Sequence, residues 1–270
     1  MSDLRAFLDA GPCTEVRVAE VRGSSPREAG AFMLVRGDAL WGTIGGGQLE
    51  YMAIDEARAL ARSGALSREM DVPLGPEIGQ CCGGRVRLAL RAVDAARARE
   101  LMREDAARRE ALPEMLIFGA GHVGRALARA LEPLPVKAKL IDSRAGELAR
   151  YSGDVQTCLS AIPEAELRAA GKGAAYVIAT HDHALDFLLA SEALERGDAA
   201  YAGMIGSKTK RARFESWHAG DAGALICPMA AAMKGDRRPE VIAAFVAAEV
   251  LAALGAMQPG VKPFVDMRET

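Results

Sequence analysis

The sequence has few of the features that mark membrane, secreted or disulfide-bonded proteins. Its longest apolar stretch, residues 241–257, is interrupted by Glu249 and falls short of the ~20 residues that cross a bilayer, so we expect no membrane association. The N-terminal sequence MSDLRAFLDAG lacks a basic stretch followed by an apolar one, which predicts no secretory signal. The five cysteines are odd in number and scattered, unlike a disulfide framework. These absences favour a cytoplasmic location.

An excess of charge of one sign is also absent. The net charge is −2, from 34 basic and 36 acidic side chains, and neither half of the chain has the basic excess of a typical nucleic-acid-binding protein. We therefore expect no nucleic-acid partner. With 270 residues, half of them apolar, the chain is long enough for a buried core and for one or two domains.

The apolar pattern divides the chain into two parts. Residues 1–112 combine strand-like segments with one amphipathic helix and end in a polar linker helix, whereas short apolar strands alternate with helices from residue 113 onward. The second pattern is typical of a parallel sheet covered on both faces. The predicted fold class is therefore α/β, with a small mixed α+β domain over residues 1–112 and a Rossmann-like, doubly wound domain over residues 113–270. Strands are predicted at 15–21, 31–35, 40–44, 86–93, 115–118, 138–141, 154–159, 175–179, 200–205 and 224–226, and helices at 48–62, 94–112, 123–131, 163–169, 184–195, 208–217 and 239–253.

A glycine motif follows the predicted strand 115–118 and opens a helix. Gly119, Gly121 and Gly124 have the G-x-G-x-x-G spacing, and Asp142 ends the next strand at about the usual distance. Gly119 would allow a tight turn, Gly121 the approach of a phosphate, and Gly124 close packing of the helix on the strand. The helix start would attract an anion, and Asp142 could accept hydrogen bonds from ribose hydroxyls or another polyol. The alternative is a turn that binds nothing.

A second glycine run, Gly45-Gly46-Gly47, lies between a predicted strand and a helix. Three consecutive glycines are costly in backbone entropy, which favours a site where a ligand approaches the backbone, such as an anion-binding nest. The preceding loop, residues 23–27, could add hydroxyl and arginine donors. The alternative is a structural turn from strand to helix.

Two adjacent cysteines, Cys81 and Cys82, lie in the glycine-rich segment GQCCGG. Adjacent cysteines suit a tetrahedral zinc poorly, but sulfur handling, contact with a soft metal or redox chemistry remain open. The alternative is a pair of small apolar residues in a tight turn. The other three cysteines, Cys13, Cys158 and Cys227, fall at or beside apolar strands and are predicted to be core residues.

Polar loops also follow two later strands, at the end of the sheet where α/β proteins bind ligands. His181, His183 and Asp186 follow the strand 175–179 and could hold a metal, although capping of the next helix by Asp182 or His183 is the favoured alternative. Gly206-Ser207-Lys208 follows the strand 200–205. Basic residues at a helix start oppose the helix dipole, which is explained if an anion binds there; a solvated basic face is the alternative.

Taken together, these motifs resemble the xanthine dehydrogenase accessory proteins of the XdhC/CoxI family. The resemblance is carried by GSSPREAGAFMLV, GTIGGGQLE and GQCCGG in the first part, and by IFGAGHVG, THDHALD, GMIGSKTKR and the Cys227-Pro228 step in the second. Two features depart from the family pattern: the linker is short, and Ala230 stands where a glycine is expected.

The resemblance implies a chaperone of the molybdenum cofactor (molybdopterin), carried as cargo rather than turned over. Such a protein would protect the cofactor during sulfuration and assist its insertion into a molybdenum hydroxylase such as xanthine dehydrogenase, with a cysteine desulfurase as a further partner and a homo-oligomeric state. No catalytic residue and no resident metal are expected. The residues expected to contact the cofactor are Gly119, Gly121, His122, Gly124, Asp142, Gly45, Gly46, Gly47, Cys81, Cys82, His181, Gly206, Ser207 and Lys208.

Two other functions remain open from the residues alone. An NAD(P)-dependent oxidoreductase would use the same glycine motif and Asp142, with His181 as proton donor. A metal-dependent hydrolase would be built on His181, His183 and Asp186.

Overall fold

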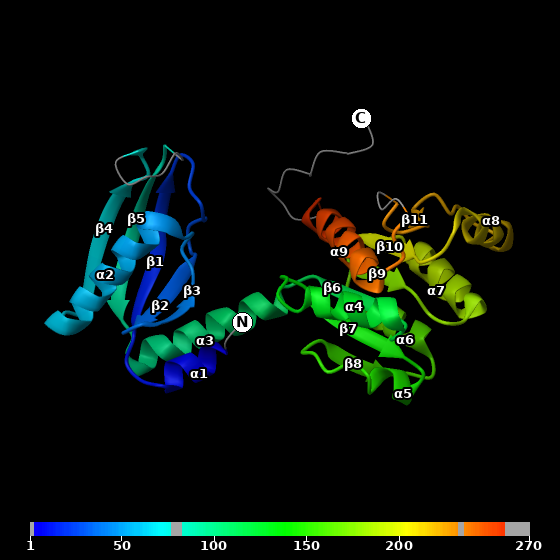
Figure 1. Cartoon of the computed structure of the whole chain (residues 1–270), viewed down its shortest axis with the longest axis horizontal. Coiled ribbons are helices and arrows are strands. Elements are labelled where there is room, and N and C mark those ends of the chain that lie inside the picture. The colour runs from blue at the N-terminus through cyan, green and yellow to red at the C-terminus, as the bar shows by residue number, and fades with distance from the viewer. Residues whose placement is uncertain (1–2, 77–82, 232–234, 257–270) are drawn as a thin grey trace. The chain divides into compact units, whose positions relative to one another are not determined.

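The computed structural model describes residues 3–76, 83–231 and 235–256, and the chain divides into two compact units, Met1–Glu110 and Ala111–Thr270. Each unit has its own sheet (Figure 1), and each has its own hydrophobic cores. The predicted fold class, a mixed unit followed by a Rossmann-like one, is confirmed by the sheets described next.

Unit 1 is built on a five-stranded antiparallel sheet with the strand order β3-β2-β1-β5-β4. Apolar residues of α2 recur every three or four positions and pack against one face of the sheet. α1 and α3 pack against the opposite face, around Phe32, Leu34 and Trp41. The elements of unit 1 are α1 (Leu4–Asp9), β1 (Thr14–Arg22), β2 (Phe32–Arg36), β3 (Ala39–Gly42), α2 (Gly47–Ser63), β4 (Ser67–Pro73), β5 (Arg85–Ala92) and α3 (Ala95–Glu110).

Three elements of the structure have no counterpart among the predicted ones, namely α1, β4 and the four-residue helix α5 (Ala145–Leu148). β4 is an edge strand in which Val72 is the one buried residue, and the rest of the strand is largely charged or polar. An edge strand of this kind lacks the apolar alternation on which prediction depends. α1 and α5 span less than two turns, too short for a helical period to be visible.

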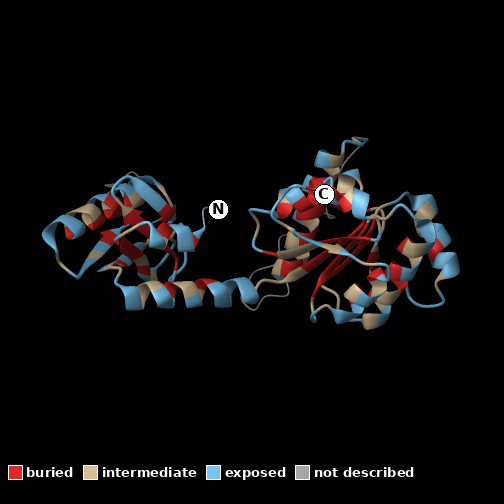
Figure 2. Ribbon diagram, turned by 90° about the horizontal axis from the view of Figure 1, so that it is seen from below, coloured by how far each residue is buried: buried red, intermediate tan, exposed pale blue. Residues whose placement is uncertain are grey.

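Unit 2 is built on a six-stranded sheet with the order β11-β10-β9-β6-β7-β8, and all its strand pairs are parallel. Its strands contribute buried residues to two hydrophobic cores, and the strand ribbons of this sheet are largely coloured as buried in Figure 2. The elements of unit 2, besides α5, are β6 (Glu114–Phe118), α4 (His122–Leu131), β7 (Lys137–Asp142), β8 (Gln156–Leu159), α6 (Pro163–Ala169), β9 (Ala175–Ile178), α7 (His183–Arg196), β10 (Tyr201–Met204), α8 (Lys208–Trp217), β11 (Leu225–Ile226) and α9 (Pro239–Ala256).

The helices of unit 2 cover both faces of the sheet. One core lies between the sheet and α4 and α9, and the other lies between the sheet and α6, α7 and α8. The strand order reverses between β6 and β9, the arrangement that places ligands of Rossmann folds at the carboxyl ends of these two strands. The glycine motif follows β6 and the loop with His181 follows β9, so both lie at those ends, and the loop with Lys208 follows the neighbouring strand β10.

α9 is the one described helix that is long and apolar enough, by length and composition, to cross a membrane; core helices of soluble proteins pass the same test. It packs along α4, with Val246, Val250 and Leu254 buried. Glu249, the charge that interrupts its apolar sequence, accepts a hydrogen bond from the Tyr201 hydroxyl of β10 at 3.0 Å.

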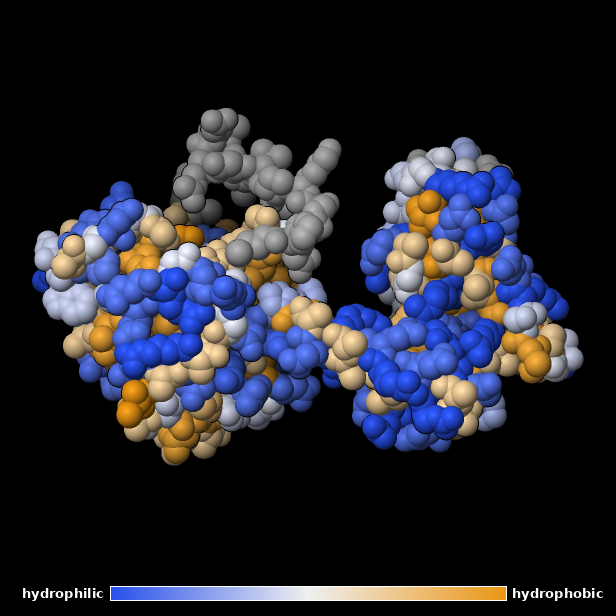
Figure 3. Space-filling model, turned by 180° about the vertical axis from the view of Figure 1, so that it is seen from behind, coloured by the Kyte–Doolittle hydropathy of each residue, from blue (hydrophilic) through white to orange (hydrophobic). Residues whose placement is uncertain are grey.

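On the face drawn in Figure 3, hydrophilic residues predominate and the apolar ones form separate patches.

Candidate functional site

The glycine turn after β6 lies where the strand order reverses. Gly119 has a φ of +109°, and a Cβ there would lie 2.2 Å from the carbonyl oxygen of Ala179, which follows β9. A Cβ on Gly124 would lie 1.8 Å from the carbonyl oxygen of Gly119. Only glycine fits at these two positions, because neighbouring backbone fills the space of a side chain. Gly119 and Gly124 are therefore required by the fold itself.

Gly121 differs from these two glycines. It is the N-cap of α4, its φ is −66°, and a Cβ there would meet nothing within 4 Å. α4 begins at this point without a side-chain cap, and its first residue, His122, is exposed. The space in front of Gly121 is open, as the approach of a phosphate to a helix start requires.

Asp142 ends β7 and is buried, with its side chain 3% exposed. Its carboxylate accepts hydrogen bonds from the backbone amides of Ala120 (2.7 Å) and Arg144 (2.9 Å). The Arg144 guanidinium donates two more, from Nε (2.9 Å) and Nη2 (2.8 Å). Burial would raise the pKa of Asp142, but the hydrogen bonds from Arg144 and Ala120 outweigh it and lower the pKa below its usual value. Asp142 thus stays ionised and holds the glycine turn to the end of β7.

Arg125 holds the same turn, and the sequence motifs do not single it out. It is buried in α4 and donates from Nη1 to the Ala120 carbonyl and, at 2.7 Å, to Glu147 Oε2. Side chains therefore bind both the amide and the carbonyl of Ala120. An arginine among the apolar residues of a short helix is the sequence signal that could have identified it.

The loop after β9 is organised by Asp186 rather than by a metal. Asp186 is buried, and its Oδ1 accepts hydrogen bonds from the Thr180 amide (3.0 Å) and hydroxyl (2.6 Å), while Oδ2 binds Lys210. Asp182 caps α7 by accepting from the Ala184 amide at 2.8 Å, as the alternative interpretation of this motif predicts. Among the residues that the structure describes, no three His, Cys, Asp or Glu side chains are placed to hold a metal ion. Because Asp186 is already bound to a cation and to Thr180, it does not support the metal-hydrolase hypothesis.

The loop after β10 begins α8. Ser207 is the N-cap and accepts a hydrogen bond from the Lys210 amide at 3.2 Å, while Gly206 and Lys208 are exposed. The basic residues of this segment divide into two groups. Lys210 and Arg211 donate to the backbone carbonyls of Ile205 and Leu225 and so serve the fold. Lys208 remains at the surface at the helix start.

The sheet of unit 2 thus brings most of the predicted contacts to one edge. The carboxyl ends of neighbouring parallel strands meet there, so loops that are distant in sequence become adjacent. The predicted residues on this edge are Gly119, Gly121, His122, Gly124, Asp142, His181, Gly206, Ser207 and Lys208.

In unit 1, the loop after β1 lies against both the Gly45–Gly47 turn and Gly84, which precedes β5. A Cβ on Gly45 would lie 2.7 Å from the Pro26 ring, and one on Gly84 would lie 2.0 Å from the Ser24 carbonyl oxygen. The loop after β1 therefore contacts both the Gly45–Gly47 turn and the end of the segment before β5. Their convergence forms a second candidate site, within unit 1.

The Gly45–Gly47 turn already holds an anion from the chain itself. Oε2 of Glu50 accepts hydrogen bonds from the Thr43 hydroxyl (2.5 Å) and from the backbone amides of Ile44 (3.1 Å) and Gly46 (3.0 Å). The anion-binding geometry expected from the glycines is present, with the carboxylate of Glu50 bound in it. A ligand anion would have to displace this side chain to use the same amides.

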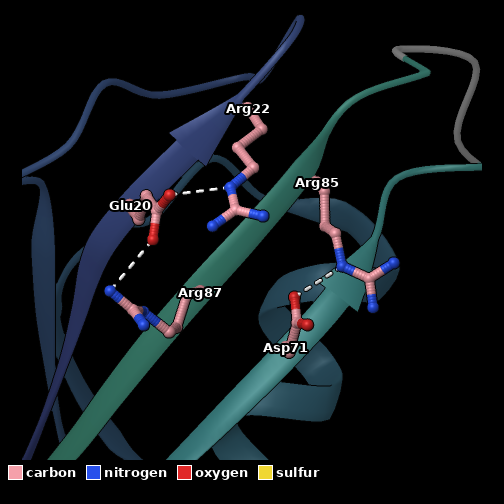
Figure 4. A pocket seen from close by; sticks show the side chains of 5 residues that line it. All are labelled: Glu20, Arg22, Asp71, Arg85 and Arg87. Carbon is pink, nitrogen blue, oxygen red and sulfur yellow. Dashed lines mark hydrogen bonds and ion pairs between the residues drawn. The ribbon is translucent and has the colours of Figure 1, made fainter.

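Cys81 and Cys82 lie outside the described residues. Elsewhere in unit 1, charged side chains of β1, β4 and β5 line a cavity of about 70 Å³ (Figure 4). Glu20 binds Arg22 (2.7 Å) and Arg87 (2.9 Å), and Asp71 binds Arg85 (2.7 Å). Of the other cysteines, Cys13 is buried and Cys158 and Cys227 are partly exposed, and burial raises the pKa of all three thiols.

The two units correspond to two known families. Residues 8–69 match the family described as XdhC and CoxI, and residues 115–250 match the XdhC Rossmann domain. This chain belongs to the XdhC family. The match covers the glycine turn, Asp142 and the loops after β9 and β10, so the resemblance stated from the motifs is confirmed.

Two individual proteins extend this comparison. YqeB of Escherichia coli (strain K12), described as uncharacterized, is 34% identical over 122 residues, which are 44% of this XdhC-family chain and 19% of YqeB. The match therefore spans about a fifth of that relative. A crystal structure from Bacillus halodurans, described as a xanthine dehydrogenase, has a TM-score of 0.78 at 20% identity and covers 98% of this chain and 99% of that one. This likeness shows the fold alone.

Proposed function

We propose that this protein is an accessory protein of a molybdenum hydroxylase such as xanthine dehydrogenase and binds the molybdenum cofactor, molybdopterin, as cargo. Membership of the XdhC family supports the accessory role. The observation that carries the binding proposal is the open space in front of Gly121. At Gly119 and Gly124 of the same turn, backbone atoms occupy the space that a side chain would need. A phosphate fits there because it needs exposed amides and a side-chain-free approach.

Each unit has a part in this proposal. The turn at Gly119–Gly124 binds the phosphate of the cofactor, and His181, Ser207 and Lys208 line the same edge of unit 2. For unit 1, contact of the cargo with Gly45–Gly47, Cys81 and Cys82 stays a prediction, because Glu50 is bound in the glycine turn and the two cysteines lie outside the described residues. Arg125, Asp142 and Asp186 keep the loops in place and take no part in chemistry. The cargo leaves unchanged by this chain, apart from sulfuration by a partner.

The partners follow from the same proposal. A cysteine desulfurase supplies the sulfur while the cofactor is bound, and the client hydroxylase receives the finished cofactor. The protein works in the cytoplasm, where thiols stay reduced, and as a homo-oligomer.

A retention experiment tests the binding step. The full chain is mixed with molybdopterin and passed through a desalting column, and the pterin is measured in the protein fraction by fluorescence after oxidation. Gly121→Asp and Gly121→Asn are compared with the unmodified protein. Both substitutions have room for a Cβ, and both residues are favourable helix N-caps, so both variants fold. They differ only in the charge placed at the phosphate position.

The proposal predicts that the unmodified protein retains the pterin, that Gly121→Asn retains part of it and that Gly121→Asp retains none. Equal retention by the Asp and Asn variants, or no retention by the unmodified protein, contradicts binding at this turn.

The alternative function, an NAD(P)-dependent oxidoreductase, gains no support from Asp142, whose carboxylate is already bound to Arg144 and Ala120. Titration with NADH distinguishes it, since micromolar binding with turnover of a carbonyl substrate would favour that function.

A further inference from the structure

The carboxylate of Asp142 is fully occupied. An ionised carboxylate has about four acceptor positions. Asp142 accepts four hydrogen bonds, one from the Ala120 amide and three from Arg144. In nucleotide-binding Rossmann folds an acidic residue at this place binds the ribose diol. A diol could bind Asp142 here only by displacing the bidentate guanidinium of Arg144, which costs two charge-assisted hydrogen bonds.

Arg144 places a cation next to the glycine turn. Its Nη2 and the Ala120 amide donate to the same carboxylate oxygen, Oδ2 of Asp142, so the guanidinium lies directly beside the turn. Two of its five N–H groups bind Asp142 in this way, and its side chain is 37% exposed. The Arg144 side chain is therefore partly exposed to solvent, and three of its guanidinium N–H groups do not bind Asp142.

Two carboxylates lie near Arg144, and each is paired with an arginine. Glu147 is paired with Arg125 at 2.7 Å and with Arg150 at 3.2 Å, and Asp142 is paired with Arg144 itself. The Asp142–Arg144 pair is neutral overall, so an anion would be attracted here by the unused guanidinium N–H groups of Arg144 and the amides of the turn rather than by a net charge. An anionic group is favoured here over a neutral diol.

We propose that Arg144 makes this site select a terminal phosphomonoester and reject the ribose diol of a nucleotide. The inference rests on the proposed function, in which the turn at Gly119–Gly124 binds a phosphate, and it names the kind of phosphate. A phosphomonoester is close to a dianion at neutral pH and offers three acceptor oxygens to the guanidinium and the turn. Each bridging phosphate of a dinucleotide carries less negative charge than a phosphomonoester. The ribose attached to it could not hydrogen-bond to Asp142, whose carboxylate already accepts four hydrogen bonds. The cargo is therefore a cofactor that ends in its own phosphate and carries no nucleotide.

Two small probes separate these chemistries on the full chain. Phenyl phosphate carries a phosphomonoester without ribose, and ADP-ribose carries a diphosphate with ribose diols. Isothermal titration of each probe gives a dissociation constant. We expect phenyl phosphate to bind at least tenfold more tightly than ADP-ribose. In Arg144→Ala, phenyl phosphate binding weakens at least tenfold, and ADP-ribose binding tightens at least tenfold because Asp142 is released.

Matched variants keep the result interpretable. Arg150→Ala removes an exposed arginine that pairs with Glu147 and should change neither constant by more than twofold. Arg144→Lys keeps the charge but loses the bidentate geometry, so its phenyl phosphate affinity should lie between those of the unmodified protein and Arg144→Ala. Circular dichroism confirms that each variant folds, and Arg144→Gln replaces Arg144→Ala if the latter does not.

The inference is overturned if the unmodified protein binds ADP-ribose as tightly as phenyl phosphate, or if loss of the Arg144 guanidinium weakens both probes equally. Molybdopterin retention is measured on the same preparations. If molybdopterin is retained but phenyl phosphate binds no more tightly than ADP-ribose, the role of Arg144 is contradicted and the proposed function stands. If phenyl phosphate binds more tightly but molybdopterin is not retained, the proposed cargo is contradicted and the role of Arg144 stands.

Discussion

Asp186 and Lys210 form an ion pair whose carboxylate is completely buried and whose lysine side chain is 11% exposed. The pair joins α7 to α8, and the same carboxylate holds the amide and hydroxyl of Thr180. Because Lys210 also donates to the Ile205 carbonyl at 3.0 Å, one pair connects the loops that follow β9 and β10. Two loops of the candidate ligand edge thus depend on a single buried interaction.

Removal of either partner of this pair should destabilise unit 2. Asp186→Asn and Lys210→Met each leave an uncompensated buried charge, and we expect a loss of about 3–5 kcal/mol in the free energy of unfolding. Urea denaturation followed by Trp217 fluorescence, in a Trp41→Phe background, reports unit 2 separately. Arg168→Gln, which breaks the exposed pair with Glu192, is the control and should cost less than ~1 kcal/mol. A loss for Asp186→Asn as small as this control would contradict the prediction.

The glycines of the turn after β6 should differ in their tolerance of alanine. Gly124→Ala places a Cβ 1.8 Å from the Gly119 carbonyl oxygen, so the helix must move and unit 2 should lose several kcal/mol. Gly121→Ala meets no atom within 4 Å and should change stability by less than ~1 kcal/mol. Thermal denaturation of the two variants side by side measures the difference. Similar melting temperatures would mean that the turn is looser than its contacts imply.

Glu50 should stabilise the Gly45–Gly47 turn of unit 1. Glu50→Ala leaves the amides of Ile44 and Gly46 without their acceptor, at an expected cost of about 1–3 kcal/mol. Denaturation is followed by Trp41 fluorescence in a Trp217→Phe background. Glu56→Ala in the same helix, which removes a partner of Arg68 outside the turn, serves for comparison. Equal losses in the two variants would show that the turn does not need this carboxylate.

The stability of unit 1 should fall in acid because of Glu15. Burial would raise the pKa of Glu15, but hydrogen bonds from Arg97 and Arg17 outweigh it, and the pKa is lowered from its usual value of 4.5. A carboxyl with a lowered pKa stabilises the fold at pH above its unfolded value, and this contribution is lost as the pH falls through the folded value. The difference in unfolding free energy between the unmodified protein and Glu15→Gln should therefore be constant from pH 7 to about pH 5 and shrink below pH 4.5. A difference that stays constant down to pH 3 would contradict this assignment.

The described cysteines should react slowly with thiol reagents. Burial raises the pKa of Cys13, Cys158 and Cys227, so each is mostly a protonated thiol at neutral pH. A fast phase with a disulfide reagent should therefore belong to Cys81 and Cys82. Stopped-flow measurement on the double variant Cys81→Ser/Cys82→Ser is expected to lack this phase. Persistence of the fast phase in that variant would assign it to one of the other three.

The sequence predicted unit 2 well because its elements have clear local patterns. Buried strands such as β6 and β9 are short apolar runs, and the glycines at 119 and 124 mark a turn that only glycine can make. β4 was missed because an exposed edge strand has no such pattern. Arg144 was missed as a site residue because an arginine looks the same in sequence whether it faces solvent or binds a buried carboxylate. Arg125 lies among the apolar residues of α4, and that signal could have identified it.

Most strands and helices, in their order, and the positions of the glycine turns were determined by the sequence alone, since the hydrophobic period and the left-handed backbone are properties of neighbouring residues. Only the tertiary structure decided which polar groups remain accessible. Asp142, Asp186 and Glu50 look equally available in the sequence, yet each is bound to loop amides or to a cation. Those partners are set by packing between elements, because a buried carboxylate must find donors wherever the folded chain places them.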